Sequence, residues 1–257
     1  MKKYILDLKV VSSETPRPGY VLLKLTDSKP LPPMCPGQFA ELKVSGSETT
    51  FLRRPISINN VVEEKNEVWF LIHAVGDGTR RLAELGAGDT LNVVMPLGRG
   101  FTFPEKGENM LLVGGGVGTA PLLYMGKKMC EAGMRPIFLL GGRTAGDLMQ
   151  LDLFRAYGDV YVTTEDGSMG EKGFVTQHSI LSQMTFNRIA TCGPKPMMQA
   201  VARYARSVNA ECEVSLENMM ACGVGACLCC VENTTEGHLC VCKEGPVFNI
   251  NRLLWQI

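Results

Sequence analysis

The stretch LLVGGGVGTAPLL, residues 111–123, decides how the middle of the chain folds. Its first residues are an apolar run of the length expected for a buried strand, and Gly114, Gly115 and Gly116 end that run. A helix begins near Thr119. This order of strand, glycine turn and helix predicts a βαβ unit. It places bare backbone and a helix N-terminus at the carboxyl edge of a parallel sheet, where a pyrophosphate or a nicotinamide binds.

The alternation of apolar runs and helical segments continues beyond this unit and predicts a parallel-sheet α/β domain over residues 104–210. A second turn of the same kind, TCGPKPMM at residues 191–198, again joins a strand to a helix. Two such turns on one sheet converge on one crevice. The predicted nucleotide site combines both turns: Gly114, Gly115, Gly116, Gly118, Thr119, Gly193 and Pro194.

Residues 1–103 carry short alternating or apolar segments, separated by Pro, Gly, Ser and charged clusters. Six of these segments have strand character, and only GTRRLAELG, residues 78–86, has helical character. The pattern predicts a six-stranded antiparallel barrel. The six strand segments are YILDLKVV, GYVLLKLT, GQFAELKV, PISINNVV, EVWFLIHAV and DTLNVVMPLG.

Two motifs in the barrel region predict a phosphate site. In RRPISI, Arg54 supplies a cation and Ser57 a hydroxyl, on an extended segment that can lie beside a ligand. In HAVGDGTRRL, Gly76, Gly78 and Thr79 open the predicted helix, and the free N–H groups of a helix N-terminus bind phosphate. Taken alone, the second motif is explained equally well as a plain capped helix after a turn.

Composition bounds the class of protein. Lys+Arg and Asp+Glu both number 26, so the 257-residue chain has no net charge, and nothing favours nucleic acid or an anionic membrane as a partner. The opening MKKYILDLKVV carries Asp7 and Lys9 within its apolar run, which predicts an amphipathic strand rather than a signal peptide. No run approaches the roughly 20 apolar residues of a membrane helix. We expect a soluble, cytoplasmic protein, where clustered cysteines serve metal or redox chemistry.

Six of the ten cysteines lie in MMACGVGACLCCVENTTEGHLCVCKEGPVF, residues 219–248. Cys222, Cys227 and Cys230 have the spacing C-x4-C-x2-C, which is typical of plant-type [2Fe–2S] clusters. The intervening glycines permit the tight turns and amide contacts that a cluster needs. A zinc site is the alternative, but zinc sites favour paired hooks with equal short spacings. We therefore predict a [2Fe–2S] segment over residues 211–257.

Spacing alone leaves the fourth ligand open. Cys240 and Cys242 stand two residues apart on a predicted strand, where alternate residues share a face. Cys229 neighbours Cys230, so the two side chains are expected to point apart. Elsewhere in the chain, Cys35, Cys130 and Cys212 are expected to be small buried hydrophobic residues.

The combination of RPIS, GDGT, GGGVGTAP and CGP resembles the ferredoxin–NADP reductase superfamily. The resemblance implies that the barrel binds FAD, that the α/β domain binds a nicotinamide dinucleotide, and that Cys192 lies beside the nicotinamide. Where the superfamily often has Tyr-Arg, this chain has Ile72-His73. The implied FAD contacts are Arg54, Pro55, Ile56, Ser57, Leu71, Ile72, His73, Gly78 and Thr79.

The cysteine-rich tail makes the resemblance more specific. SLENMMACGVGACLCCV and CVCKEGPVF are similar to the electron-transfer subunit of the NAD-dependent, two-subunit dihydroorotate dehydrogenase, and the similarity covers essentially the whole chain. In that family the fourth ligand directly precedes the turn KEGPVF, which implies Cys242 and leaves Cys229 and Cys240 spare. The implied cluster ligands are Cys222, Cys227, Cys230 and Cys242.

This resemblance implies an oxidoreductase subunit of de novo pyrimidine biosynthesis that has no dihydroorotate site of its own. Electrons would run from an FMN-containing catalytic partner to the cluster, then to FAD and to NAD+, in a heterotetramer of two plus two chains. The nearest alternative is a diaphorase-type subunit of a sulfhydrogenase or of a ferredoxin–NADP transhydrogenase. A zinc-bearing interaction module on an inactive reductase fold is an alternative of a different class.

The choice between NAD and NADP is open at the level of residues. Arg143, at the end of the second predicted strand of the α/β domain, is placed to read a 2′-phosphate. In the segment TTEDGSMGEKG, Glu165 or Asp166 is placed to meet a ribose hydroxyl instead. The family resemblance implies NAD.

Overall fold

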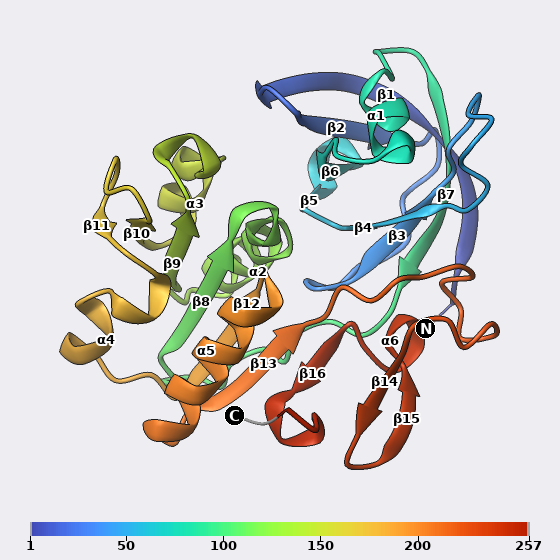
Figure 1. The fold of residues 1–257 in the computed structure, drawn as a ribbon. Coiled ribbons are helices and arrows are strands. Elements are labelled where there is room, and N and C mark those ends of the chain that lie inside the picture. The colour runs from blue at the N-terminus through green and yellow to red at the C-terminus, as the bar shows by residue number, and fades with distance from the viewer. Residues whose placement is uncertain (1, 256–257) are drawn as a thin grey trace.

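The computed structural model describes residues 2–255, and Figure 1 shows their arrangement. The first part is an antiparallel sheet with the strand order β4-β3-β7-β1-β2-β6-β5. A 3-10 turn, η1 (Glu63–Lys65), follows β5, and the short helix α1 (Asp77–Ala83) follows β6. The strands are β1 (Tyr4–Arg17), β2 (Tyr20–Thr26), β3 (Phe39–Leu42), β4 (Arg54–Ser57), β5 (Asn60–Val62), β6 (Glu67–His73) and β7 (Thr90–Leu97).

The two edges of this sheet meet, so it closes into a barrel. Only Ile58 and Asn59 separate the edge strands β4 and β5. The Ile58 N–H donates to the Gln38 carbonyl next to β3, and the Asn59 N–H donates to the Trp69 carbonyl on β6, both at 2.9 Å. The predicted barrel is confirmed. The predicted count of six strands is wrong, because the segment PISINNVV changes its neighbour at these two residues and forms two strands.

The second part is a seven-stranded sheet with the order β11-β10-β9-β8-β12-β13-β16. All neighbouring strands are parallel except β13 and β16. Because β8 and β12 are adjacent and parallel, the glycine turn after one and the Cys-Gly-Pro turn after the other open at the same edge. The strands are β8 (Met110–Gly115), β9 (Ile137–Gly142), β10 (Asp159–Thr164), β11 (Glu171–Lys172), β12 (Arg188–Cys192), β13 (Glu211–Ser215) and β16 (Val247–Asn249).

Helices connect these strands and pack against the sheet (Figure 1). The two longest are α2 and α5, which follow the glycine turn and the Cys-Gly-Pro turn. None of the helices among residues 2–255 is long and apolar enough to cross a membrane. The helices are α2 (Ala120–Glu131), α3 (Leu151–Tyr157), α4 (Ile180–Gln183) and α5 (Lys195–Ser207), with short 3-10 turns η2 (Gly116–Thr119), η3 (Ala145–Asp147) and η4 (Val175–Gln177).

Two strands from the predicted cluster segment belong to this second sheet. β13 pairs with β12 in parallel, and β16 pairs with β13 in antiparallel fashion. Cys212 and Val214 of β13 are buried in the same apolar cluster as Ile189 of β12. A boundary at residue 210 therefore divides a continuous sheet, because the alternating segment ECEVS completes the α/β core rather than starting a separate unit.

The remaining C-terminal residues contact the end of the barrel near β7 and the α/β sheet near β13. A hairpin of β14 (Val231–Thr234) and β15 (Gly237–Cys240) precedes the single helical turn α6 (Val241–Glu244), and η5 (Ile250–Arg252) follows β16. The Arg99 N–H, just after β7, donates to the Gly245 carbonyl at 2.6 Å. The cysteine loop, residues 221–230, has no helix or strand and lies between α/β strand β13 and this hairpin.

His178 gives the α/β domain a predicted pH response. It is buried, its Nδ1 accepts the Ile180 N–H at 3.0 Å, and its ring packs edge-on against Tyr161. Burial lowers the pKa of His178, and nearby Glu171 opposes this shift. In the unfolded chain the pKa of this histidine is near 6.5, whereas in the folded chain it is lower. As the pH falls below about 6.5, the unfolded chain gains a proton that the folded chain does not, so the folding stability decreases.

A His178→Asn variant is expected to flatten this dependence, because its Oδ1 can accept the same N–H and does not titrate. The measurement is the urea unfolding midpoint at pH 7.5 and at pH 5.5. His238→Asn, on the exposed side of β15, is the matched control and should follow the wild type. An unchanged pH dependence in His178→Asn would contradict the assignment.

Candidate functional site

The cysteine loop folds around the thiol of Cys222. The N–H groups of Val224, Ala226 and Cys227 point at its Sγ, with N···S distances of 3.4, 3.3 and 3.5 Å. The two glycines of the loop make this possible, since they adopt φ of +65° and +84°. Burial disfavours the Cys222 thiolate, but the three N–H groups outweigh burial and lower the pKa of the thiol to about 6. The loop thus favours the thiolate, which is the form that binds metal.

The four predicted cluster ligands form two pairs. Cys222 shares a thiol hydrogen bond with Cys227, and Cys230 shares one with Cys242. The Cys242 N–H also donates to the Cys230 Sγ at 3.3 Å. Burial, and then the contact with Cys230, raises the pKa of the Cys242 thiol to about 12. The second pair is therefore the more deeply enclosed of the two.

This pairing decides which metal group the thiols fit. Within residues 2–255, no three His, Cys, Asp or Glu side chains gather around a single point. A zinc ion takes its four ligands around one point. A [2Fe–2S] cluster has two irons and takes two protein ligands on each. Two thiol pairs, on one loop and its neighbouring turn, match the two protein ligands that each iron of such a cluster takes.

The structure also separates Cys240 from Cys242. β15 ends at Cys240 and α6 begins with the next residue, so the two do not share a strand face, contrary to the expectation from their spacing. Cys242 is buried beside Cys230, whereas Cys240 and the exposed Cys229 lie outside both pairs. Among the scattered cysteines expected to be buried, Cys212 is buried but Cys35 and Cys130 are exposed.

A buried glutamate connects the cysteine loop to the barrel. A Cβ on Gly223 would lie 2.6 Å from Cγ of Glu41, so only glycine fits at this contact. Glu41 is 1% exposed, and neither of its carboxylate oxygens has a hydrogen-bond partner in the described structure. Burial raises the pKa of Glu41 to about 7. Because Glu41 on β3 is paired with Pro55 on β4, the cysteine loop lies next to the predicted flavin motif.

The two arginines of that motif have different surroundings. Arg53 donates to the carbonyls of Glu41 and Asn92 at 3.2 and 3.1 Å and to the Asn92 side chain, so it braces β3 against β7. Within residues 2–255, Arg54 donates only to the neighbouring Leu52 and Arg53 carbonyls. Its Nε lies 2.6 Å from the position of a Cβ on Gly78, at the start of α1. A guanidinium without a carboxylate partner over a helix N-terminus fits a flavin pyrophosphate.

The other predicted flavin contacts differ in how their side chains lie. Pro55, Ile56 and Ser57 are half-buried on the edge strand β4. Thr79 uses its hydroxyl to accept the Gly76 N–H and to donate to the Gly76 carbonyl. On β6, the Leu71 and Ile72 side chains are buried in apolar clusters, which leaves only their backbone for a ligand. His73 stacks on Tyr20, with ring centroids 4.1 Å apart and an interplanar angle of 1°.

A cavity of about 590 Å³ lies between the barrel and the α/β domain. Tyr20 and His73 line it from the barrel side. On the other side it is lined by predicted nucleotide contacts from both turns, namely Gly115, Gly116, Gly118, Gly193 and Pro194. The cavity is large enough for a ligand, and several of its lining residues are glycines, whose bare backbone a dinucleotide can approach closely.

The remaining predicted nucleotide residues lie beneath this floor. Gly114 and Thr119 are buried, and a Cβ on Gly114 would lie 2.8 Å from the Thr119 side chain. Cys192 is 1% exposed, and burial raises the pKa of its thiol. Its carbonyl oxygen lies 2.6 Å from the position of a Cβ on Gly118. These residues hold the two turns together, and the contact of the Cys192 side chain with a nicotinamide stays a prediction.

Several residues that line the cavity were not foreseen. Asp147 pairs with Arg17 across the domain interface and accepts the N–H of Arg143 at 3.0 Å. The segment TAGD, with Thr and Asp three residues apart, carried a helix-capping signal that could have identified it. Glu217 also lines the cavity. Sequence offered no signal for Glu217, which comes to the cavity through the pairing of β13 with β12.

Two family domains match the chain. Residues 112–203 match the oxidoreductase NAD-binding domain, and residues 217–254 match the iron–sulfur cluster binding domain of dihydroorotate dehydrogenase B. The second match contains both thiol pairs. The first contains both turns that line the cavity.

Among solved structures, the chain superposes with an NADH-dependent reduced ferredoxin-NADP oxidoreductase, with a TM-score of 0.86 and 29% identity over 96% of this chain and 90% of that one. Phthalate dioxygenase reductase, at 20% identity and a TM-score of 0.66, covers 90% of this chain and 87% of that one, and shares the fold. The sheet and barrel arrangement is therefore that of the ferredoxin reductases.

Curated relatives are closer in sequence. A chain from Bacillus velezensis is 44% identical over 218 residues, covering 83% of this chain and 84% of that one. A chain from Shouchella clausii is 40% identical over 225 residues, covering 85% and 86%. Both are named dihydroorotate dehydrogenase B (NAD(+)), electron transfer subunit. With this identity over nearly the whole length, the chain belongs to the family of dihydroorotate dehydrogenase B electron transfer subunits.

Proposed function

We propose that this chain carries electrons between a dihydroorotate-oxidising partner subunit and NAD+, through a [2Fe–2S] cluster and FAD. The partner is an FMN-containing catalytic chain, the complex holds two copies of each subunit, and its product feeds de novo pyrimidine synthesis. The names of the curated relatives support the choice of reaction and partner. A cytoplasmic location is part of the proposal and agrees with ten cysteines that are free of disulfides.

The observation that carries this proposal is the position of the barrel between the two other sites. On one side, Gly223 of the cysteine loop touches Glu41 on β3, whose neighbour β4 is the predicted flavin strand. On another side, Tyr20 and His73 of the barrel line the nucleotide cavity. A flavin exchanges electrons in pairs with a nicotinamide and singly with an iron–sulfur cluster, so it belongs between them.

The chain's own residues bind, orient and tune the groups of this relay. Arg54 and the first turn of α1 would hold the flavin phosphates. The bare backbone of Gly115 and Gly116 would let a dinucleotide come close to the sheet edge. The N–H groups around Cys222 stabilise negative charge on sulfur, which is one way in which a protein sets a cluster potential.

The partner is proposed to dock over the cysteine loop. Three apolar side chains of this region are exposed, Met219 by 83%, Leu228 by 65% and Val224 by 38%. They surround the thiol pair of Cys222 and Cys227 in sequence. An exposed apolar patch next to a redox group suits a protein partner that must come close to it.

The proposal is tested with anaerobically purified protein. The visible spectrum, the iron and sulfide content, and the response to NADH are recorded, followed by reduction with dihydroorotate in the presence of the partner chain. Flavin and cluster bands that NADH bleaches, and NADH production that requires dihydroorotate and the partner, are the expected results. A colourless, zinc-containing protein would reject the redox function.

A second candidate is favoured by one observation. The 29% identical structure with TM-score 0.86 belongs to a ferredoxin-NADP oxidoreductase, not to a dihydroorotate enzyme. If this chain served such a complex, NADH-reduced protein would pass electrons to ferredoxin or NADP+ through a different partner. A dihydroorotate-dependent rate with the FMN partner, and none with ferredoxin, would exclude that candidate.

The charges around the cavity favour NAD over NADP. Glu165, just after β10, lines the cavity, and its carboxylate has no hydrogen bond or ion pair within residues 2–255. The Asp166 carboxylate instead accepts the N–H and hydroxyl of Ser168 at 2.9 and 2.6 Å. Arg143 also lines the cavity, but its Nε lies 3.5 Å from the Asp147 carboxylate. Asp147 is shared with Arg17, so the preference for NAD rests on Glu165, whose unpaired carboxylate would repel a 2′-phosphate.

A Glu165→Gln variant is therefore expected to raise kcat/KM for NADPH by about tenfold and to change that for NADH by less than about threefold. Steady-state reduction of an artificial acceptor with each nucleotide measures the ratio. Asp166→Asn is the matched control, because its carboxylate is held by Ser168. A wild-type ratio in Glu165→Gln, or an equal change in the control, would contradict the assignment.

A further inference from the structure

The helix that carries the nucleotide turn is attached to the barrel at its first residue. Asn59 is fully buried, and its Nδ2 donates to the Ala120 carbonyl at 3.0 Å. The same Nδ2 donates to Gln150 Oε1, and Gln150 Nε2 donates back to Asn59 Oδ1, both at 3.0 Å. Every polar atom of the Asn59 side chain is thus used across the domain interface. Asn59 stands two residues after Ser57, the last residue of the flavin strand.

Gln150 adopts an unusual backbone conformation at this contact. Its φ is 57°, in the left-handed region that residues other than glycine rarely occupy. It directly precedes α3. A non-glycine residue in this region persists only where its surroundings hold it there, and such residues concentrate at functional sites. The amide pair with Asn59 is the contact that this conformation presents to the barrel.

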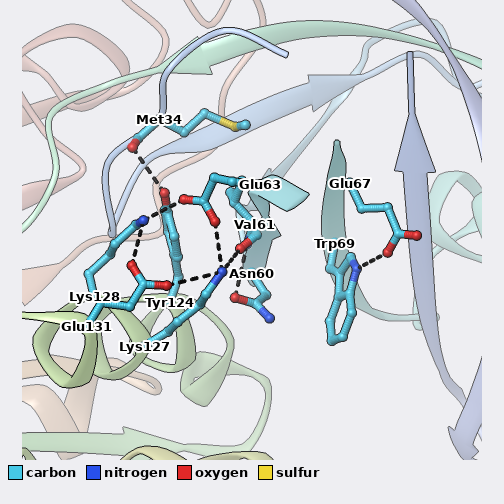
Figure 2. Close-up of polar contacts among 10 residues, drawn as sticks. All are labelled: Met34, Asn60, Val61, Glu63, Glu67, Trp69, Tyr124, Lys127, Lys128 and Glu131. Atoms are coloured by element: carbon cyan, nitrogen blue, oxygen red, sulfur yellow. Dashed lines mark hydrogen bonds and ion pairs between the residues drawn. The ribbon is translucent and has the colours of Figure 1, made fainter. Parts of the chain in front are cut away.

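Figure 2 shows a second attachment, which joins Lys127 and Lys128 of the same helix to Val61 and Glu63. Lys127 is only 8% exposed, and its Nζ donates to the Val61 carbonyl and, at 2.8 Å, to Glu63. Lys128 reaches the other oxygen of Glu63 at 2.5 Å and also binds Glu131. A buried lysine is costly unless it is paired, so this cluster is a specific contact rather than a loose surface pair.

The two attachments together set the direction of α2. Ala120 and Lys127 are seven residues apart, or about 10 Å along the helix axis. Their partners Asn59, Val61 and Glu63 follow the flavin strand directly in sequence. A single contact would let the helix pivot, whereas two contacts along its length hold its axis. The nucleotide turn at one end of α2 is thereby held against the strand that carries the flavin motif.

We propose that Asn59 and Lys127 are positioning residues for electron transfer between the nucleotide and the flavin. They bind neither group, and they hold the nucleotide turn and the flavin strand in one geometry. In the transfer they support, the C4–H bond of NADH breaks and a hydride, with both electrons, bonds to the flavin, leaving NAD+ and an anionic reduced flavin. This inference rests on the proposed function of the two sites.

The test separates positioning from binding. Anaerobic rapid mixing of the FAD- and cluster-loaded protein with NADH gives both the limiting rate of flavin reduction and the NADH dissociation constant. We expect Asn59→Ala and Lys127→Met to lower the limiting rate by about ten- to a hundredfold, because misplacement by about 1 Å has effects of this size. The NADH dissociation constant and the FAD content should stay within about threefold of wild type.

A second readout does not depend on activity. Hydrogen exchange measured by mass spectrometry should show faster exchange in residues 58–63 and at the start of α2 in both variants, with exchange in the cysteine loop unchanged. Arg135→Met is the matched control, since its exposed pair with Asp159 lies wholly within the α/β domain. Its rate and exchange should equal those of the wild type.

Other outcomes would contradict either this inference or the proposed function. A wild-type limiting rate, or a weakened NADH affinity at an unchanged rate, would overturn the inference. If Lys127→Met fails to fold, Glu63→Gln carries the test, because the Glu63 side chain is 50% exposed and its loss leaves the Val61 contact in place. A wild-type protein that NADH does not reduce would reject the proposed function instead, without bearing on how the domains are attached.

Discussion

A Cys230→Ser variant is expected to lose the iron–sulfur cluster while keeping FAD and its reaction with NADH. Cys230 is 2% exposed and is paired with Cys242, and in the proposed cluster this pair would supply both protein ligands of one iron. A serine hydroxyl does not supply a thiolate at neutral pH, and thiolates are the ligands that iron–sulfur clusters require. Iron content should fall at least about tenfold, and dihydroorotate-dependent NAD+ reduction should stop.

The reaction with NADH should survive, because it uses other parts of the molecule. Arg54 and Gly78 on the barrel, and the cavity between barrel and α/β domain, share no residue with the Cys230 pair. Iron and sulfide assays, electron paramagnetic resonance of the reduced protein, and bleaching of the flavin by NADH measure the three functions separately. Loss of flavin bleaching together with the cluster would mean that the two sites depend on each other for folding.

Cys229→Ser is the matched control for this variant. Cys229 is the neighbouring residue, has the same chemistry, is exposed and lies outside both thiol pairs. It should keep its iron and its electron transfer to the partner. Full iron in Cys230→Ser together with loss in Cys229→Ser would reverse the ligand assignment.

At the cysteine site, spacing predicts the first three ligands but leaves the fourth open. The interval C-x4-C-x2-C is a local property, and the structure places the first two of these cysteines as one pair on one loop. The fourth position is set by a hairpin, which returns the chain from β14 to α6 and brings Cys242 to Cys230. Spacing could not choose it, because the end of β15 at Cys240 depends on that pairing and not on composition.

For the fold too, local patterns were predictable from the sequence and pairings between distant segments were not. The alternation in residues 1–103 predicted strands because it is local to each segment, whereas three of the six strand pairs (β3–β7, β1–β7 and β2–β6) join segments that are not neighbours in sequence. The two-strand outcome of PISINNVV depends on closure at Ile58 and Asn59. The strand β13 was grouped with the cysteine-rich segment because it lies between helix α5 and the cysteines that begin at Cys222. Its place in the sheet is set by parallel pairing with β12, which lies across helix α5.

Some of the residues that line the cavity could be predicted from the sequence, and others could not. The glycine turns were visible as motifs, since bare backbone after a buried strand has few other uses. Tyr20 and Glu217 were not visible, because each reaches the cavity through contacts with distant strands. His73 departs from the Tyr-Arg pattern of the superfamily, and its stacking on Tyr20 accounts for its position without assigning it a flavin contact.

The second large effect is expected from Gly118→Ala, which should lower the rate of flavin reduction by NADH about a hundredfold. A Cβ at this position would lie 2.5 Å from Gly193 Cα and 2.6 Å from both the Gly193 nitrogen and the Cys192 carbonyl oxygen. These atoms are backbone and cannot rotate away. The glycine turn and the Cys-Gly-Pro turn must therefore separate, which deforms the floor of the cavity on which both turns meet.

The comparison with Gly133→Ala isolates this steric effect. Gly133, just after α2, has a φ of +76° and no atom within 4 Å of an added Cβ, so alanine there adds only the strain of a left-handed conformation, about 1 kcal/mol. It should lower the unfolding midpoint slightly and leave the NADH rate unchanged. Gly118 has no positive φ, so backbone freedom does not require glycine there. A low rate of flavin reduction in Gly118→Ala, together with a wild-type rate in Gly133→Ala, would show that the close contact between the two turns requires it. Gly118→Ala with a wild-type rate would place the nucleotide away from these turns.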